Sequence, residues 1–206
     1  MTKTKKYNKH NSKVSSSLSP ALFLDRDGTI NYDKNYLCCE KDLKIYKNIE
    51  KSLIKIRKLG FKIVIVTNQS GIARKYFTLA QLKKVNAKLL KMLKERGIKI
   101  DGLYYCPHGP DDNCDCRKPK PGMAYQAAKD LNIDLKKSYM IGDSVRDYIF
   151  GYKFGGKGIM VLTGHGKKQL AKIKEEKQKP LAVARNLSQA VNVVIRQLKT
   201  AMYNVQ

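Results

Sequence analysis

The sequence has no long apolar run and few acidic residues. None of its apolar stretches approaches the roughly 18 residues that a membrane-spanning helix requires, so we expect no such span. The N-terminus also lacks the apolar segment of a secretory signal, and we therefore expect a cytoplasmic protein. The 206 residues, 42% of them apolar, suffice for one domain with a substantial core.

The sequence has 17 acidic and 42 basic residues, which gives a net charge of +25. Such a balance suggests nucleic acid as a partner. The basic stretches contain no interleaved aromatic residues, however, and no helix-turn-helix or RNP-type motif is evident. We therefore favour a lysine-rich solvated surface, which also attracts small anionic substrates. Residues 1–19 predict a flexible basic tail, 20–166 the main domain, and 167–206 a basic segment packed on that domain.

The five cysteines are an odd number, which argues for thiols or a metal site rather than a disulfide framework. Three of them lie with one histidine in a stretch of eleven residues, as Cys106, His108, Cys114 and Cys116. Three thiolates and one imidazole form a complete tetrahedral Zn²⁺ set with no open position, so we expect a structural zinc loop. Cys38 and Cys39 lie outside this cluster and are interpreted as packing residues or free thiols.

Short apolar segments alternate with segments of helical periodicity. We expect strands at 21–24, 61–66, 103–105, 138–141 and 159–162. Helices are expected at 46–59, 78–96, 125–131, 145–154 and 187–198, with Thr78 and Gln81 forming a capping box. This alternation predicts an α/β fold, an open and mostly parallel Rossmann-like sheet with helices on both faces.

Polar residues follow several of these strands, at the edge where such sheets bind ligands. Asp25 and Asp27 point the same way from an extended chain, so their carboxylates favour a cation beside them. Asp143 follows another strand, and the three acids offer the hard oxygen ligands that suit Mg²⁺. The Thr67 hydroxyl can hold phosphoryl oxygens, although Thr67 alone is equally typical of a turn at a strand end. Lys118 can neutralise phosphate charge, although a lone lysine in so lysine-rich a chain is more typical of a solvated surface.

Four of these segments together resemble the haloacid dehalogenase-like (HAD-like) phosphatases. Leu24-Asp25-x-Asp27-Gly28-Thr29 resembles their first motif, Thr67 the second, Lys118 the third and Gly142-Asp143-x-x-x-Asp147 the fourth. The resemblance implies that Asp25 attacks phosphorus and that Asp27 protonates the leaving oxygen and then activates water. It also implies Mg²⁺ held by Asp25, the Asp27 backbone carbonyl and Asp143. The short segment between the first two motifs predicts no large cap domain.

The cysteine loop narrows the resemblance. C-x-H-x₅-C-x-C-R-K-P-x-P-G is similar to the branch of histidinol-phosphate phosphatases and D-glycero-D-manno-heptose-1,7-bisphosphate 7-phosphatases. The run from Asn68 to Arg74 resembles the heptose enzymes, which implies removal of the 7-phosphate in making ADP-heptose for lipopolysaccharide. The implied substrate contacts are Asp33, Tyr36, Asn68, Gln69, Ser70 and Arg117.

Three alternatives remain beside a monomer acting on a small phosphorylated sugar. Histidinol phosphate is the nearest alternative substrate, and a polynucleotide phosphatase is supported by charge alone. A nucleic-acid-binding protein on a retired phosphatase fold is the rival of another class. The intact set of motif residues, Asp25, Asp27, Lys118 and Asp143, argues against that last alternative.

Overall fold

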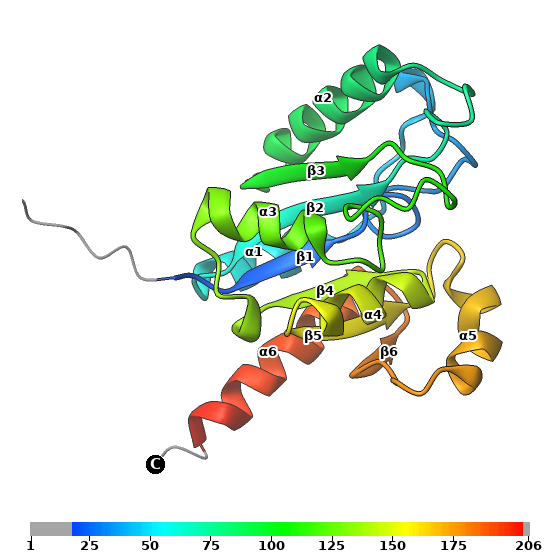
Figure 1. The fold of residues 1–206 in the computed structure, drawn as a ribbon. Helices are drawn as coiled ribbons and strands as arrows, with labels where there is room; N and C mark the ends of the chain where they lie inside the picture. The colour runs from blue at the N-terminus through cyan, green and yellow to red at the C-terminus, as the bar shows by residue number, and fades with distance from the viewer. Residues whose placement is uncertain (1–17, 204–206) are drawn as a thin grey trace, which may run out of the picture.

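The computed structural model describes residues 18–203, and its centre is a six-stranded parallel sheet (Figure 1). The strands are β1 (Ala21–Leu24), β2 (Lys62–Asn68), β3 (Gly102–Cys106), β4 (Tyr139–Gly142), β5 (Lys157–Val161) and β6 (Ala182–Ala184). Their spatial order is β3-β2-β1-β4-β5-β6. The chain winds outward from β1 to one edge and then continues from β4 to the other. The switch point between β1 and β4 is where such sheets bind ligands.

Helices cover both faces of the sheet. α1 (Glu50–Lys58), α2 (Leu79–Glu95) and α6 (Leu187–Tyr203) share one apolar cluster on one face, and α3 (Gly122–Leu131) and α4 (Val145–Lys153) share another. α5 (Gly166–Glu175) lies beyond the carboxyl ends of the strands and packs against α4 (Figure 1). Two 3-10 turns, η1 (Glu40–Asp42) and η2 (Leu135–Lys137), complete the elements.

The alternation of side chains along each strand builds these two clusters. On β1, Leu22 and Leu24 belong to the cluster of α1, α2 and α6, whereas Ala21 and Phe23 belong to that of α3 and α4. A strand buried on both faces must be apolar at every position, which explains its uninterrupted apolar run. Asp25, the first charged residue after this apolar run, therefore lies at the edge of the core.

The expected elements are present, with shifted ends. The helix expected from 46 begins at Glu50, and the one expected from 125 begins at Gly122. The predicted loop from Thr67 was wrong at its start, because Thr67 and Asn68 end β2 and pair with β3. The Thr78–Gln81 capping box is confirmed. Two elements, α5 and β6, were not predicted, because α5 is lysine-rich and β6 has three residues.

The connections above the sheet are loops and short helices, so the described residues contain no large cap domain. No helix in 18–203 is long and apolar enough to cross a membrane.

Residues 1–17 of the expected tail lie outside the described residues. Ser19 is bonded through its backbone to Asn132 and Asp134, ahead of β1. At the other end of the chain, β6 pairs with β5 and α6 packs on α1.

Candidate active site

Four sequence-predicted residues meet at the switch point. Asp25 follows β1, Thr67 ends β2, Lys118 comes from the loop after β3, and Asp143 follows β4. They line one cleft of about 180 Å³ with Asp27, Asn68, Ser144, Arg146, Asp147, His165 and Gln169. The strand ends therefore place acids, a hydroxyl and a cation around one volume, as expected for a doubly wound sheet.

Lys118 is the buried cation of this cleft, with only 3% of the residue exposed. Its Nζ lies 2.6 Å from Asp25 Oδ1 and 2.7 Å from Asp147 Oδ1, and it donates to the Val66 carbonyl at 2.9 Å. Burial alone would lower the pKa of Lys118, but the charges of Asp147 and Asp25 outweigh burial and raise it. Lys118 is therefore a fixed ammonium group beside Asp25.

Asp147 orients this lysine and caps the start of α4. Its Oδ2 accepts the Ser144 backbone N–H in a capping box, while its Oδ1 contacts Lys118. Asp147 therefore both caps α4 and positions the cation.

The acids of the cleft are crowded in a way that suits a divalent cation. Carboxylate oxygens of Asp25, Asp143 and Asp147 lie within 4.8 Å of one another. Burial and the neighbouring acids raise the pKa of Asp25 well above its usual range, against the opposing charge of Lys118. Burial, with the charge of Asp147, raises the pKa of Asp143 to about 7. These oxygens are the ligand type that Mg²⁺ takes, and a cation would relieve their repulsion.

Asp143 is held by a backbone hydrogen bond and by close backbone approach. The His165 backbone N–H donates to its Oδ2 at 2.7 Å. Gly28 and Gly164 pack on the same carboxylate, and a Cβ at either position would collide with it. Gly28 also has φ +81°, a conformation that favours glycine. The glycine of the Asp-x-Asp-Gly-Thr segment is thus required by both the turn and the acid.

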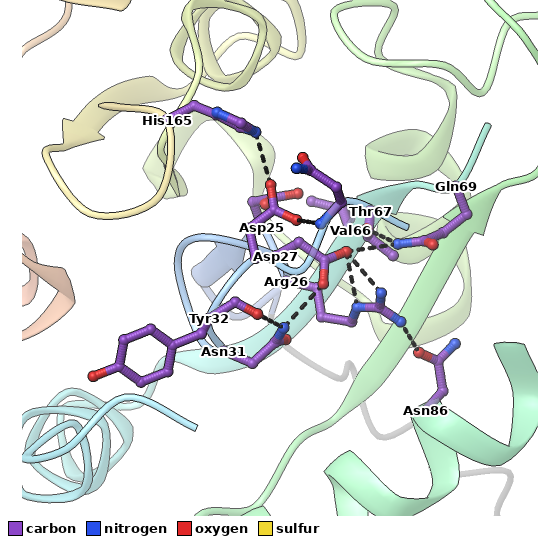
Figure 2. A network of polar contacts seen from close by, with 12 residues as sticks. Asp25, Arg26, Asp27, Asn31, Tyr32, Val66, Thr67, Gln69, Asn86 and His165 are labelled. Carbon is purple, nitrogen blue, oxygen red and sulfur yellow. Dashed lines mark hydrogen bonds and ion pairs between the residues drawn. The ribbon is translucent and has the colours of Figure 1, made fainter. Parts of the chain in front are cut away.

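Asp27 lines the same cleft but does not belong to the group of three close carboxylates. Its carboxylate accepts hydrogen bonds from Arg26, Asn31 and Gln69 (Figure 2). Burial opposes its ionisation, but the charge of Arg26 and these hydrogen bonds outweigh burial and lower the pKa of Asp27. The pKa values of the two aspartates are therefore shifted in opposite directions, upward for Asp25 beside other acids and downward for Asp27 beside hydrogen-bond donors.

The cysteine loop gathers its four expected ligands. Neighbouring ligand atoms of Cys106, His108, Cys114 and Cys116 are 3.2–3.7 Å apart. Ligands about 2.0–2.3 Å from a central zinc ion at tetrahedral angles would be about 3.5–3.8 Å apart. The sulfur–sulfur separations are too long for disulfides, and all three thiols are free.

One of the three thiols is electrostatically prepared for a metal, whereas burial raises the pKa of Cys106 and of Cys116 in the absence of one. Burial alone would raise the pKa of Cys114, but hydrogen bonds with Cys116 and Cys106 lower it to about 7. A lowered pKa favours the thiolate, the form that binds zinc. The loop also positions the neighbouring cation, because Arg117 Nη1 donates to the His108 carbonyl at 3.0 Å.

A second cavity of about 230 Å³ adjoins the acid cluster. Five of the six expected substrate contacts line it, namely Asp33, Tyr36, Asn68, Gln69 and Ser70. The sixth, Arg117, lines a different cavity of about 370 Å³ beside the cysteine loop. The amide of Asn68 bonds to the Lys118 backbone, so this residue positions the cation as well as lining the cavity.

Four residues of the cleft, Ser144, Arg146, His165 and Gln169, had no sequence signal, and two of them also line a neighbouring cavity. His165 lines both the acid cleft and the adjoining cavity, and its Nε2 lies 2.7 Å from Asp33 Oδ2. Arg146 lines both the acid cleft and the cavity of Arg117. Arg146 lies inside the fourth motif, but at a position where the motif accepts any residue. His165 lies in the loop after β5, which contains no acidic residue that would have marked it as part of a site.

Fold and site together define a hydrolase of the HAD-like class. The HAD-hydrolase-like family model matches residues 115–190. A heptose-1,7-bisphosphate 7-phosphatase of Helicobacter pylori J99 is 44% identical over 144 residues, covering 69% of this chain and 83% of that protein. One from Photorhabdus laumondii is 44% identical over 154 residues, covering 70% of this chain and 81% of that protein.

A solved structure agrees with these relatives. The D,D-heptose 1,7-bisphosphate phosphatase from B. bronchiseptica, complexed with magnesium and phosphate, has 31% identity and a TM-score of 0.77. It is matched over 86% of this chain and 99% of that chain. The chain belongs to the D-glycero-beta-D-manno-heptose-1,7-bisphosphate 7-phosphatase family of HAD-type phosphatases.

Proposed function

We propose that this phosphatase hydrolyses the 7-phosphate of D-glycero-beta-D-manno-heptose 1,7-bisphosphate, on the way to ADP-heptose for lipopolysaccharide. The placement of Lys118 Nζ 2.6 Å from Asp25 Oδ1 carries the proposal. An aspartate can attack a phosphate dianion only where cationic groups offset the repulsion between them. The choice of heptose bisphosphate as the substrate rests on the names of the relatives at 44% identity.

In the first displacement, an Asp25 carboxylate oxygen forms a bond to phosphorus. The bond between phosphorus and the sugar oxygen breaks, and the Asp27 carboxyl group gives that oxygen its proton. Asp27 is ionised among its hydrogen-bond donors. The arriving phosphate is a like charge, which raises the pKa of Asp27 and favours the protonated form that the step needs.

In the second displacement, water attacks the phosphorus of the aspartyl phosphate. Asp27 takes the proton of the water, the bond between Asp25 and phosphorus breaks, and inorganic phosphate leaves. Thr67 assists both displacements. Its Oγ1 accepts a hydrogen bond from Gln69 Nε2 at 2.8 Å, so its own proton is free to face a phosphoryl oxygen in the cleft.

We propose two metals for the site. Asp25, the Asp27 backbone carbonyl and Asp143 would hold Mg²⁺, which neutralises charge on the phosphoryl group when it is bound. Cys106, His108, Cys114 and Cys116 would hold a structural Zn²⁺, a closed four-ligand set. Such a zinc ion would fix the loop that presents Arg117 and Lys118.

We also propose that substrate enters beside Asp33, Tyr36, Asn68, Gln69 and Ser70, with Arg117 contacting the sugar or its second phosphate. We propose a monomer acting on a small phosphorylated sugar, and cavities of about 180, 230 and 370 Å³ suit a ligand of that size. Three thiols kept reduced for a metal suit a cytoplasmic location.

The experiment is a parallel measurement of kcat/KM for heptose 1,7-bisphosphate, histidinol phosphate and a 3′-phosphorylated oligonucleotide. We expect the heptose bisphosphate to have the highest value. A higher value for either other ester would replace the proposed substrate but retain the phosphatase. Salt-sensitive retention on DNA that persists in Asp25→Ala, without turnover of any ester by the wild type, would favour the binding protein instead.

A further inference from the structure

Arg26 carries a buried charge and has no role in the two proposed displacements. Among the described residues, it is the largest side chain that is fully buried. Its guanidinium lies between Asp27 and Asn86, a residue of α2 (Figure 2). Removing a guanidinium from water is strongly unfavourable unless well-placed partners offset the lost hydration. Its partners therefore indicate what this residue does.

The guanidinium binds Asp27 through two of its nitrogens. Nε lies 3.2 Å and Nη2 lies 2.7 Å from Asp27 Oδ2. Because the fork is planar, two bonds to one oxygen restrict where that oxygen can lie. Gln69 Nε2 donates to the same oxygen at 2.9 Å, and Asn31 Nδ2 donates to the other at 2.9 Å. The carboxylate is thus held from three sides, and Arg26 supplies the charged contact.

Asn86 binds the guanidinium nitrogen that does not contact Asp27. Its Oδ1 accepts from Arg26 Nη1 at 2.7 Å. Asn86 is a buried polar residue in the apolar stripe of α2, among Leu82, Val85, Leu89 and Leu93. An asparagine costs helix stability relative to alanine, and a buried amide costs more unless it is bonded. The contact with Arg26 accounts for this amide and ties the guanidinium to a helix of 17 residues.

We propose that Arg26 is a positioning residue for Asp27, with Asn86 fixing the guanidinium against α2. The inference rests on the proposed function, in which Asp27 exchanges protons with the leaving oxygen and with water. Proton transfer requires the donor to stay within hydrogen-bond reach of the reacting oxygen, so the orientation of Asp27 decides its efficiency. Arg26 itself touches neither substrate nor metal in this proposal.

Leaving-group chemistry separates this role from a merely structural one. A sugar alkoxide leaves only with a proton, whereas p-nitrophenolate leaves readily without one. The value of kcat/KM reports events through the first displacement, because the leaving group departs there. Misplacing Asp27 must therefore lower kcat/KM for alkyl phosphates and spare that for p-nitrophenyl phosphate.

The test compares Arg26→Lys and Asn86→Leu with wild type on glycerol 3-phosphate and p-nitrophenyl phosphate, in the presence of Mg²⁺. For Arg26→Lys we expect kcat/KM to fall about tenfold or more on the alkyl ester and less than about threefold on the aryl ester. Asn86→Leu retains Arg26 and Asp27, folds without a charge change, and should shift the same ratio in the same direction by a smaller factor.

Arg57→Lys is the matched control, because it alters another arginine–aspartate pair. Arg57 Nη1 contacts Asp101 at 2.6 Å, at the amino ends of β2 and β3 and therefore at the edge of the sheet opposite the cleft. This variant should lose stability without changing the ratio between the two esters. Folded Arg26→Lys and Asn86→Leu proteins that keep the wild-type ratio would overturn the inference. Turnover of heptose bisphosphate by the wild type tests the proposed function separately, since the ratio depends on no particular sugar.

Discussion

The amide of Asn68 forms two hydrogen bonds with the backbone of Lys118. Nδ2 donates to the Lys118 carbonyl at 3.1 Å, and the Lys118 N–H donates to Oδ1 at 3.0 Å. Asn68 is the last residue of β2, so this pair joins the loop that carries the cation to a central strand. The irregular loop thereby gains the rigidity that its own sequence does not supply.

Replacement of Asn68 by alanine should misplace the cation without removing it. We expect kcat/KM for a phosphate ester to fall about tenfold to a hundredfold, because small displacements of a reacting group are costly. Asn68→Asp keeps the Oδ1 acceptor but places a carboxylate oxygen opposite the Lys118 carbonyl and adds negative charge to the cleft, so it should lose at least as much. Steady-state kinetics of both variants check this expectation, and an alanine variant as active as wild type would contradict it.

The sequence predicted the elements and the motif residues because both depend on local patterns. Apolar alternation and the abrupt polar ends placed Asp25, Thr67, Lys118 and Asp143 at the same edge of the sheet. The contact between Asn68 and Lys118 joins residues 50 positions apart and leaves no periodic signal. His165 was missed for the same reason, since its position depends on how the loop after β5 folds back.

Asp25→Asn should abolish turnover, because an amide cannot form the aspartyl phosphate. Asp27→Asn should instead slow turnover of a sugar phosphate by about 10² to 10⁴, the usual contribution of general acid–base catalysis. Mass spectrometry of acid-quenched enzyme should find phosphate on Asp25 in the Asp27→Asn variant but not in Asp25→Asn. Turnover by Asp25→Asn at the wild-type rate would refute covalent catalysis.

Purified protein should contain about one Zn²⁺ per chain, and Cys114→Ser should lose most of it. Loss of the metal should lower the melting temperature by roughly 6–12 °C, which corresponds to about 3 kcal/mol in a chain of this size. It should also raise KM, since the His108 carbonyl would no longer fix Arg117. Cys38→Ser, outside the cluster, is the control, and equal metal content in both variants would rule out the site.

Asp101 should make stability depend on pH at the acid end. It accepts hydrogen bonds from Arg57 and from the Ile63 backbone N–H. Burial opposes its ionisation, but these bonds and the charge of Arg57 lower the pKa of Asp101 below its ordinary value of 3.8. Its stabilisation is therefore complete above about pH 4, the range of an unfolded aspartate, and is lost as the pH falls through its lower folded pKa.

Asp101→Asn should accordingly be less stable than wild type at pH 7 by about 1.5–3 kcal/mol, the worth of a hydrogen bond to a charged group. The difference between the two proteins should shrink below about pH 4, as the wild-type carboxylate becomes protonated. Urea unfolding of both proteins across this range measures the difference directly. A difference that stays constant from pH 7 to below the folded pKa would show that the charge of Asp101 contributes nothing.

Arg117 should discriminate between one phosphate and two. Its guanidinium is held by the His108 carbonyl and lines the cavity beside the cysteine loop, where Lys118 Nζ is already bound to Asp25 and Asp147. Arg117→Ala should weaken binding of heptose 1,7-bisphosphate by roughly 1.5–3 kcal/mol, about tenfold to a hundredfold in KM, and affect a monophosphate much less. Lys136→Ala removes the same charge from an exposed position in η2 and controls for the overall positive field. Equal losses on both substrates, or an equal loss in Lys136→Ala, would mean that net charge rather than Arg117 selects the bisphosphate.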